Sequence, residues 1–417
     1  MNHRCRGGLA CVILMTAGQP HERLALMLRR LLYRKSAPEV SHSLRHGVVR
    51  RWLVLHQGEN PSTDYYVYPR LQELGLPIIY KNLDSALPEA GDLSPGTAVV
   101  IIRYLNARWA RALHIHRAHL PRVVYFMDDD LLRPQSWKGL PRPYVKKLHK
   151  YCRAHTTDIR DLATEYWFST QALRDRYPER AAKLVPPRAL HEDARRLRSH
   201  KVPPDSPILV FYHGSAAHQA EIAWLQPIMA QVLARCPNIH FELIGAHDVN
   251  VLYRRLPRTR VVHPMDWANY RGHCRLLDGH IGLAPLLPST FNAARSHVKA
   301  YDIARCRAAG LYAASGPYHE VIRHSENGLL LDNNPQSWVE ALCALADDPD
   351  RLHALRVAAQ GLLQRQATDQ ANALAGTPGS PVQVAITRSP TGSGTTPTPR
   401  DAAPPAGNIP DSAEMES

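Results

Sequence analysis

Short apolar runs alternate with helix-forming segments along most of this 417-residue chain. Its first half contains such runs at residues 51–55 (RWLVL), 76–80 (LPIIY), 98–102 (AVVII), 123–127 (VVYFM) and 166–170 (YWFST). Strands that alternate with helices predict a parallel sheet covered by helices on both faces. Ligands of such sheets bind beyond the carboxyl ends of the strands. In this chain the loop 56–66 (HQGENPSTDYY) and the triplet Asp128–Asp130 occupy such ends.

The same alternation begins again after residues 189–207, a charged and proline-rich segment that reads as a linker. The second half has apolar runs at 208–212, 240–244, 260–263, 281–286 and 311–314, followed by a helical segment at 335–364. A chain of this length can hold two domains. We therefore expect an α/β protein in which two Rossmann-like domains, residues 49–188 and 208–366, face each other across a cleft.

The two ends of the chain depart from this pattern. Residues 1–48 form a basic extension, in which residues 21–35 (HERLALMLRRLLYRK) have the pattern of a basic amphipathic helix. Such a helix lies on an anionic membrane surface or packs as an ordinary helix, and the sequence favours neither. The apolar segment 9–17 is too short to span a bilayer. Residues 367–417 are rich in Pro, Gly, Ser, Thr and Ala and lack aromatic residues, so we expect a disordered tail.

The charge and the cysteines restrict the function classes. A formal net charge of +14 favours anionic partners. The basic residues are spread along the chain, without a zinc-finger or helix-turn-helix pattern, which argues against nucleic acid. The seven cysteines (5, 11, 152, 236, 274, 306 and 343) form no CxxC pair. This scatter is typical of reduced, buried thiols in a cytosolic protein, and not of a disulfide or zinc framework.

The segment 291–302 (FNAARSHVKAYD) carries the strongest functional signal. It lies between two apolar runs, and its pattern predicts a helix start that carries Arg295, Ser296 and Lys299. Helix amide groups attract anions, and two cations four residues apart add charge on the same face. Asp302 falls on that face and can accept hydrogen bonds from ribose hydroxyls. The segment therefore predicts a site for a nucleoside diphosphate that carries a sugar; the alternative is a solvated, salt-bridged helix face.

Three segments in order resemble one enzyme family. They are 211–221 (FYHGSAAHQAE), 281–302 (IGLAPLLPSTFNAARSHVKAYD) and 316–331 (GPYHEVIRHSENGLLL). With these segments the chain, from about Trp52 to Leu363, resembles the GT-B glycosyltransferases, in particular the group 1 (family 4-like) enzymes of bacterial polysaccharide assembly.

The resemblance implies roles for particular residues. Arg295 and Lys299 would hold the donor diphosphate and stabilise the charge that develops as the sugar departs. Asp302 would stand at the position of the family's ribose-binding glutamate. The other implied donor-site residues are Gly214, Ser215, Ser296, Tyr318 and Glu320. The chain departs from the family at Ala294, where the family has the first of two glutamates, and in the loop after 208–212, which lacks the usual Lys or Arg.

The triplet Asp128–Asp130 leaves several interpretations open. We favour a role on the acceptor side of the cleft or in the structure of the cleft. One carboxylate, Asp129, would deprotonate the acceptor hydroxyl if it faces the cleft. Carboxylates in this arrangement also suit Mn²⁺ or Mg²⁺, as in the Asp-x-Asp motif of the other main glycosyltransferase fold. A third interpretation is a cap for the following helix. Arg103 would contact an acceptor phosphate or form a salt bridge with the triplet.

Histidines and one tryptophan beside these segments also have competing interpretations. His213 and His218 flank the Gly214–Ser215 turn, and one of them would bind the donor or assist acceptor deprotonation, or both are structural. The loop 263–267 is placed to meet the nucleotide base, although Trp267 is as compatible with the core. His114, His116 and His119 resemble a metal cluster, but His114 and His116 face different sides of a helix, which argues against a metal site.

Together these patterns predict a glycosyltransferase that moves a sugar from a nucleoside-diphosphate sugar to a glycan or lipid-linked acceptor. We expect it to be metal-independent, without a cofactor beyond the donor substrate, and retaining by analogy with the family. We expect a cytoplasmic location, with peripheral association to the inner membrane face as a variant. The alternatives are a nucleotide-sugar epimerase or hydrolase of the same fold, a catalytically degenerate nucleotide-sugar-binding protein, and an Asp-x-Asp metal enzyme.

Overall fold

A computed structural model describes residues 47–190, 200–203 and 206–375. The predicted amphipathic helix at 21–35 lies outside these residues, as does the predicted tail beyond residue 375. Within the described residues, no helix has both the length and the apolar character needed to cross a membrane.

The N-terminal half contains a parallel six-stranded sheet in the order β2-β1-β3-β4-β5-β6. Its strands are β1 (Arg51–His56), β2 (Ile78–Asn82), β3 (Thr97–Ile102), β4 (Val123–Met127), β5 (Glu165–Phe168) and β6 (Ala182–Leu184). The central strands β3 and β4 are buried along their whole length, which explains why their sequences are continuously apolar.

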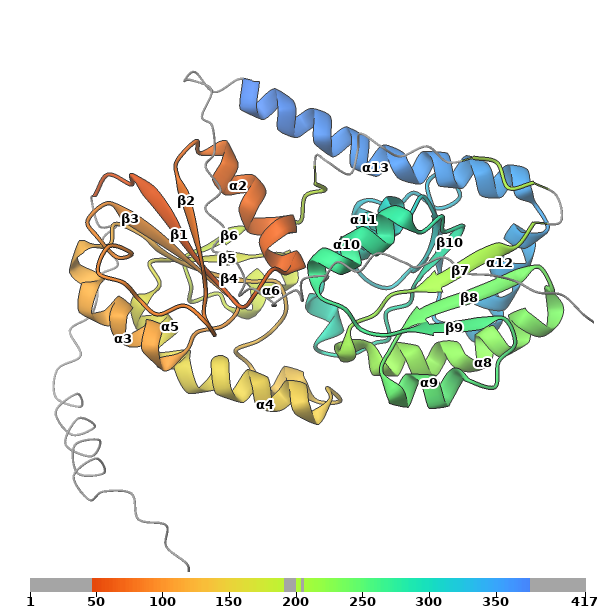
Figure 1. Cartoon of the computed structure of the whole chain (residues 1–417), viewed down its shortest axis with the longest axis horizontal. Helices are drawn as coiled ribbons and strands as arrows, with labels where there is room; N and C mark the ends of the chain where they lie inside the picture. Colours follow the sequence, from red (N-terminus) through yellow and green to blue (C-terminus); the bar gives the residue numbers. More distant parts are fainter. Residues whose placement is uncertain (1–46, 191–199, 204–205, 376–417) are drawn as a thin grey trace, which may run out of the picture. The chain divides into compact units, whose positions relative to one another are not determined.

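Short helices connect these strands. They are η1 (Thr63–Val67), α2 (Tyr68–Glu73), α3 (Ala107–His116), η2 (Arg117–His119), η3 (Pro134–Trp137), α4 (Arg142–Tyr151), η4 (Arg153–His155), α5 (Thr156–Leu162) and α6 (Gln171–Arg176). The start of α3 is fixed by Asn106, whose side chain accepts a hydrogen bond from the Trp109 backbone N–H at 3.0 Å. Figure 1 shows helices flanking this sheet.

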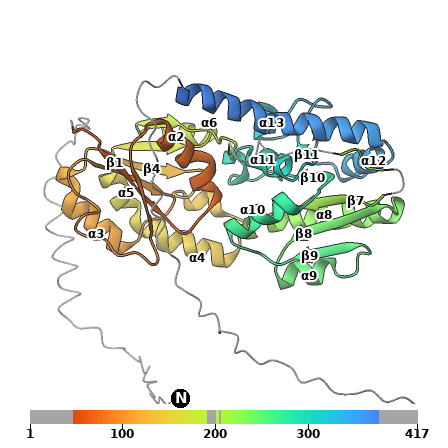
Figure 2. The same cartoon turned by 45° about the horizontal axis from the view of Figure 1, so that its top comes forward.

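The C-terminal half contains a second parallel six-stranded sheet, in the order β12-β11-β10-β7-β8-β9. Its strands are β7 (Ile208–Tyr212), β8 (Ile239–Ile244), β9 (Thr259–Val262), β10 (Ile281–Ala284), β11 (Ala309–Ala313) and β12 (Leu329–Leu331). Its helices are η5 (Ala216–His218), α8 (Gln219–Arg235), α9 (His247–Tyr253), α10 (Trp267–Leu276), η6 (Asn292–Ala294), α11 (Val298–Arg305), η7 (Pro317–Glu320), α12 (Pro335–Ala346) and α13 (Pro349–Ala375). Helix α13 packs against α11 and β11 (Figures 1 and 2).

Each sheet has one place where the strand order reverses. In the N-terminal half it lies between β1 and β3, and in the C-terminal half between β7 and β10. At such a switch point the loops that follow the two strands run in opposite directions and leave a crevice. Both switch points lie at carboxyl ends of strands, where a ligand site is expected.

The predicted strands are all present, and the α/β fold class is confirmed. The sequence did not reveal β6 and β12, edge strands of three residues each. Helix α13 continues through Ala375, so the first part of the predicted disordered tail is helical. Ala, Gln and Leu in this stretch are good helix formers, which allows the helix to continue. The described cysteines are free and buried, as predicted.

Candidate functional site

A cavity of about 720 Å³ lies at the carboxyl ends of strands from both sheets. Its volume suits a cofactor-sized or substrate-sized ligand. Its lining residues include Glu59, Asn60, Tyr66, Asp128 and Asp129 from the N-terminal half, and His213, Gly214, Ser215, His218, Arg295, Ser296, Lys299, Asp302 and Tyr318 from the C-terminal half. The predicted catalytic and donor-site residues line this cavity except Glu320, and of the other candidates Asp130 and Arg103 do not line it.

Arg295 reaches the cavity from a loop. The turn η6 ends at Ala294, Arg295 has extended backbone angles (φ −74°, ψ 156°), and α11 begins only at Val298. The prediction that Arg295 and Lys299 share one helix face is therefore wrong. The turn forms because the Asn292 amide donates to the Leu287 carbonyl at 2.9 Å, which closes the loop before the helix can start.

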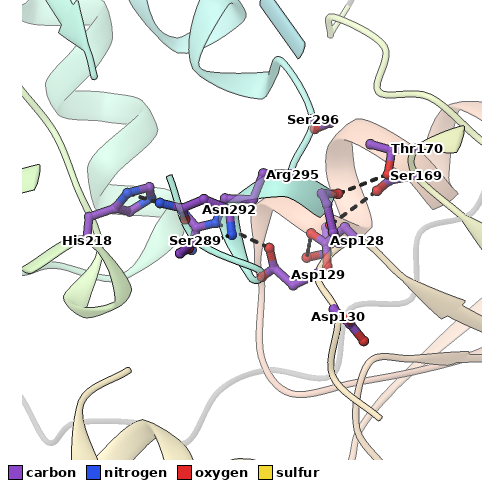
Figure 3. Close-up of polar contacts among 12 residues, drawn as sticks. Asp128, Asp129, Asp130, Ser169, Thr170, His218, Ser289, Asn292, Arg295 and Ser296 are labelled. Carbon is purple, nitrogen blue, oxygen red and sulfur yellow. Dashed lines mark hydrogen bonds and ion pairs between the residues drawn. The ribbon is translucent and has the colours of Figure 1, made fainter. Parts of the chain in front are cut away.

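The Arg295 guanidinium lies between the imidazole of His218 and the carboxylate of Asp129 (Figure 3). On one side its Nη1 contacts His218 Nε2, and on the other its Nε is 3.6 Å from Asp129 Oδ1. The guanidinium also lies over the Phe291 ring, 5.2 Å from its centroid. One long ion pair thus compensates this cation only in part, which leaves it able to attract an anionic ligand.

His218 is buried beside Arg295. Burial lowers the pKa of His218, and the neighbouring Arg295 lowers it further, to about 3, although Glu221 opposes the change. The imidazole is therefore neutral near pH 7 and accepts a hydrogen bond from Arg295. Because its basicity is so low, the arrangement favours a role in orienting Arg295 over deprotonation of an acceptor.

Lys299 lies in the first turn of α11, largely buried. Its Nζ donates a hydrogen bond to the His213 carbonyl oxygen and lies 5.3 Å from the centroid of the Tyr212 ring. Burial lowers the pKa of Lys299 to about 8, although the carboxylate of Asp302 opposes the change. Among the described residues, no carboxylate lies within ion-pair distance of this ammonium group. An anion in the cavity would supply the missing charge.

Gly214 follows the switch-point strand β7. A Cβ atom at this position would lie 2.7 Å from Cε1 of the Tyr212 ring, closer than real Cβ atoms approach. Packing on Tyr212 thus requires glycine here, a reason that the sequence did not reveal. Ser215 follows as the N-cap of η5, and its carbonyl accepts a hydrogen bond from the His218 backbone N–H at 2.9 Å. Both residues line the cavity, as predicted.

Asp302 and Ser296 contact adjacent tyrosines of η1. The Tyr65 hydroxyl donates to Asp302 Oδ1 at 2.5 Å, and Arg305 Nη1 lies 3.1 Å from the same oxygen. The hydroxyls of Tyr66 and Ser296 form a hydrogen bond. These partners lie more than two hundred residues away in the chain, so local spacing could not reveal them. The proposed ribose role of Asp302 rests on its second carboxylate oxygen.

Tyr318 and Glu320 lie on the short helix η7 but face different surroundings. Tyr318 is buried and lines the cavity. Glu320 Oε2 is instead 2.9 Å from His297 Nδ1, and this residue does not line the cavity. The structure therefore does not bring Glu320 together with the other predicted donor-site residues.

The carboxylates of the Asp triplet diverge. Asp128 and Asp129 line the cavity, whereas Asp130 points away from Arg295 (Figure 3). The buried carboxylate of Asp130 accepts hydrogen bonds from Ser136 Oγ at 2.5 Å, Arg176 Nη1 at 2.7 Å and the Tyr177 hydroxyl at 2.5 Å. Asp130 is thus part of the structural core of this half.

Arg103 compensates the two cavity carboxylates. Its Nη1 lies 3.0 Å from Asp128 Oδ1 and its Nη2 lies 2.9 Å from Asp129 Oδ2, so the predicted salt bridge to the triplet is confirmed. Burial raises the pKa of Asp128, although the neighbouring Arg103 opposes the change. Arg103 has a φ of +63°, a conformation that non-glycine residues rarely adopt. The Tyr125 hydroxyl, which donates to the Arg103 carbonyl at 2.8 Å, helps to hold it.

Two residues at the cavity have clear structural roles. Trp267 lines it, but its Nε1 donates to Asp64 Oδ2 at 2.8 Å and its ring stacks on Tyr270, which supports the core interpretation. Glu221, whose role the sequence did not reveal, accepts hydrogen bonds from the Leu287 backbone N–H at 3.1 Å and the Asn292 amide at 2.7 Å. Glu221 thereby fixes the loop that presents Arg295. An acidic residue at the start of a largely apolar helix was the feature of the sequence that could have indicated this role.

Comparison with known proteins identifies the fold of the chain. No protein-family model matches the chain, and no curated protein matches its sequence. Among solved structures, it is similar to sucrose-phosphate synthase from Thermosynechococcus elongatus, with a TM-score of 0.51 and 12% identity over 78% of this chain and 97% of that one. HepE from Anabaena, in complex with UDP and glucose, gives a TM-score of 0.49 and 13% identity over 78% and 98%.

A third similar structure, TarM of S. aureus, gives a TM-score of 0.46 and 9% identity over 68% of this chain. The chain spans about half of that protein (55%). The two parallel six-stranded sheets, together with the similarity to the sucrose-phosphate synthase, show that this chain has the GT-B glycosyltransferase fold.

Proposed function

We propose that the chain is a glycosyltransferase that moves a sugar from a nucleoside-diphosphate sugar to a hydroxyl of a glycan or lipid-linked acceptor. The observation that carries the proposal is the state of Lys299. It is a largely buried cation with a pKa of about 8 and no carboxylate partner among the described residues, and it lines the cavity together with Arg295. A diphosphate in this place offsets the cost of burying the ammonium group.

In the proposed reaction, the donor diphosphate lies at the switch point between β7 and β10. Gly214 and Ser215 lie at the end of one strand, and the loop that carries Arg295 follows the other. The acceptor oxygen bonds to the anomeric carbon, and the bond from that carbon to the diphosphate oxygen breaks. Arg295 and Lys299 stabilise the negative charge that develops on the leaving diphosphate. Two cations supply this stabilisation without a metal ion.

The acceptor in this proposal enters from the side of Asp128 and Asp129. Their carboxylates accept hydrogen bonds from sugar hydroxyls, and Asp129 takes up the acceptor proton. The ion pairs that Arg103 forms with both carboxylates fix their positions, which favours hydrogen-bonded positioning of the acceptor. Retention of configuration and the polysaccharide pathway remain expectations from the family resemblance.

The test begins with donor binding. Calorimetric titration of the full chain with UDP-, GDP- and dTDP-sugars identifies the donor, and transfer to acceptor sugars is followed by mass spectrometry. Arg295→Ala and Lys299→Ala are each expected to lower kcat/KM about 100-fold or more. The matched control is Lys201→Ala, because Lys201 forms an exposed ion pair with Asp350 and does not line the cavity.

Unchanged donor binding and turnover in both variants would contradict the proposal. Free sugar or an epimer formed without acceptor would instead identify a hydrolase or an epimerase. Donor binding without transfer to any acceptor would identify a binding protein. Loss of turnover in EDTA that added Mn²⁺ or Mg²⁺ restores would identify an Asp-x-Asp metal enzyme.

A further inference from the structure

Three side chains with metal-binding atoms meet next to the cavity: His213, Cys274 and Cys306. Their ligand atoms all lie within 4.8 Å of one another. His213 directly follows β7, Cys274 lies in α10, and Cys306 directly follows α11. Both thiols are fully buried, and His213 is 8% exposed and lines the cavity. The wide separation of these residues in the chain explains why no sequence motif marks the cluster.

The His213 ring is oriented for a partner on the thiol side. Its Nε2 lies 3.0 Å from Glu242 Oε1, and because a carboxylate only accepts, Nε2 is the donor of this hydrogen bond. The other ring nitrogen, Nδ1, is buried and has no hydrogen-bond partner. A histidine held by a carboxylate through one nitrogen, with the other one available, is the usual arrangement of a metal-ligating histidine.

Glu242 itself is well anchored. His273 Nε2 lies 2.8 Å from its Oε1, and Arg260 contacts its Oε2. His213, Glu242 and His273 also form a metal-compatible group, but there the carboxylate already receives hydrogen bonds from both histidines and from a guanidinium. The second group is therefore satisfied without an ion. The His213 Nδ1 that has no hydrogen-bond partner is instead a ligand atom for the group with Cys274 and Cys306.

The ligand types select the metal. Two thiolates and one imidazole form a soft set, typical of Zn²⁺. The two negative charges offset the charge of the ion, so the loaded site is neutral and can stay buried. Ligand atoms around a tetrahedral zinc ion lie roughly 3.7 Å apart, so a small contraction of the cluster suffices.

We propose that His213, Cys274 and Cys306 bind one Zn²⁺ ion. Binding forms two zinc–sulfur bonds and one zinc–nitrogen bond, and the two thiol protons pass to solvent. A tetrahedral ion has a fourth position, which water from the adjoining cavity can fill. The ion would fasten α10 and the end of α11 to the residue that follows β7. The His213 carbonyl accepts a hydrogen bond from Lys299, so the zinc ion would position this part of the cavity. This role does not depend on glycosyl transfer.

The experiment measures metal binding to the full chain. The reduced protein is stripped with a chelator and desalted, and Zn²⁺ is added in competition with a chromophoric indicator. We expect one Zn²⁺ per chain by elemental analysis. Replacement by Co²⁺ should give a thiolate-to-cobalt charge-transfer band together with the visible bands of a tetrahedral site.

Variants identify the ligands. Cys274→Ser and Cys306→Ser should each abolish stoichiometric binding, whereas Cys236→Ser and Cys343→Ser should retain it. The latter two cysteines are a matched control, because they form a second buried pair in the same half of the molecule. His273→Gln should also retain the ion. Glu242→Gln should weaken binding about 10- to 100-fold, the usual effect of losing the group that orients a ligand.

Several results would overturn the site. They are the absence of stoichiometric zinc in the wild-type protein, equal binding by Cys274→Ser, and a loss of binding in the control cysteine variants. A Cys274–Cys306 disulfide in the protein as purified would also overturn it. If a variant fails to fold by circular dichroism, the wild-type cobalt spectrum decides, since a spectrum without a thiolate band excludes both cysteines.

Discussion

The two halves bring charge to the cavity in opposite ways. In the N-terminal half, Arg103 forms close ion pairs with both Asp128 and Asp129, so the carboxylates are compensated within the fold. In the C-terminal half, the polar contacts of Lys299 within the described residues are with a carbonyl oxygen and an aromatic ring, and Arg295 has a neutral histidine and a long ion pair. In the N-terminal wall of the cavity (Arg103, Asp128 and Asp129) the charges compensate one another. In the C-terminal wall (Arg295 and Lys299) the described residues leave the positive charge largely uncompensated.

This difference separates stability from binding. A compensated ion pair that is largely buried contributes to the folded state mainly because removing one partner leaves the others unpaired. An uncompensated, largely buried cation costs folding free energy, and a ligand can recover that cost on binding. Substitutions in the two walls should therefore act on different measurements.

The largest effect is expected from Arg103→Ala. It leaves Asp128 without its cation and Asp129 with the long ion pair to Arg295, and we expect a loss of about 3–5 kcal/mol in the free energy of unfolding, measured by denaturant titration. Arg160→Ala is the control, because Arg160 pairs with Asp161 at an exposed site. That variant should change stability by less than about 0.5 kcal/mol. Equal effects of the two substitutions would mean that the cavity wall is not held by Arg103.

The matching substitution in the other wall is Lys299→Met. It removes a charged hydrogen-bond donor, so we expect nucleoside-diphosphate affinity to fall about 10- to 100-fold by calorimetry. The free energy of unfolding should not fall, because the substitution also removes a charge that burial disfavours. A clear loss of stability with unchanged affinity would reverse the comparison and make Lys299 a structural residue. Lys201→Met should change neither quantity.

The alternation of apolar runs was sufficient to predict the two sheets, because strands that are buried on both faces must be apolar throughout. β3 and β4 are of this kind. The edge strands β6 and β12 could not be predicted, since three residues at a sheet edge carry no such constraint. The end of α13 could not be predicted from composition. A segment with few apolar residues is not expected to be buried, but it can still form a helix.

The site could be predicted as a set of residues but not as a set of contacts. Spacing placed Lys299 and Asp302 on one helix, and both line the cavity. The turn η6, which separates Arg295 from that helix, depends on Glu221 and Asn292, and the hydrogen bond from Tyr65 to Asp302 spans the two halves. Such long-range partners are set by packing, which a single sequence does not display.

Glu221 tests whether the C-terminal wall is preorganised. Glu221→Gln replaces a carboxylate that accepts the Leu287 N–H and the Asn292 amide, so we expect a loss of about 1–2 kcal/mol in the free energy of unfolding. Burial alone would raise the pKa of Glu221, but interactions with His218 and backbone amides lower it to about 2. Its contribution is therefore present above the ordinary pKa and is lost as the pH falls toward 2. The difference between wild type and variant should shrink over that range, and a constant difference would contradict this assignment.

The smallest effect, and the most specific to the C-terminal wall, is the pH dependence of diphosphate affinity. Lys299 has a pKa of about 8 in the free protein, and a bound anion raises it. Affinity should therefore be constant below about pH 8 and fall by up to tenfold per pH unit above it, as binding comes to require uptake of a proton. Lys299→Arg should remove this slope, because a guanidinium stays charged throughout. Neither Tyr212, whose ring faces Lys299, nor the cavity residue Tyr318 should titrate in this range, since burial raises the pKa of both hydroxyls. The same slope in the arginine variant would assign the titration to a group other than Lys299. The comparison of the two walls would then lose its basis, because Lys299 would no longer be shown to be a cation whose charge is compensated only when an anion binds.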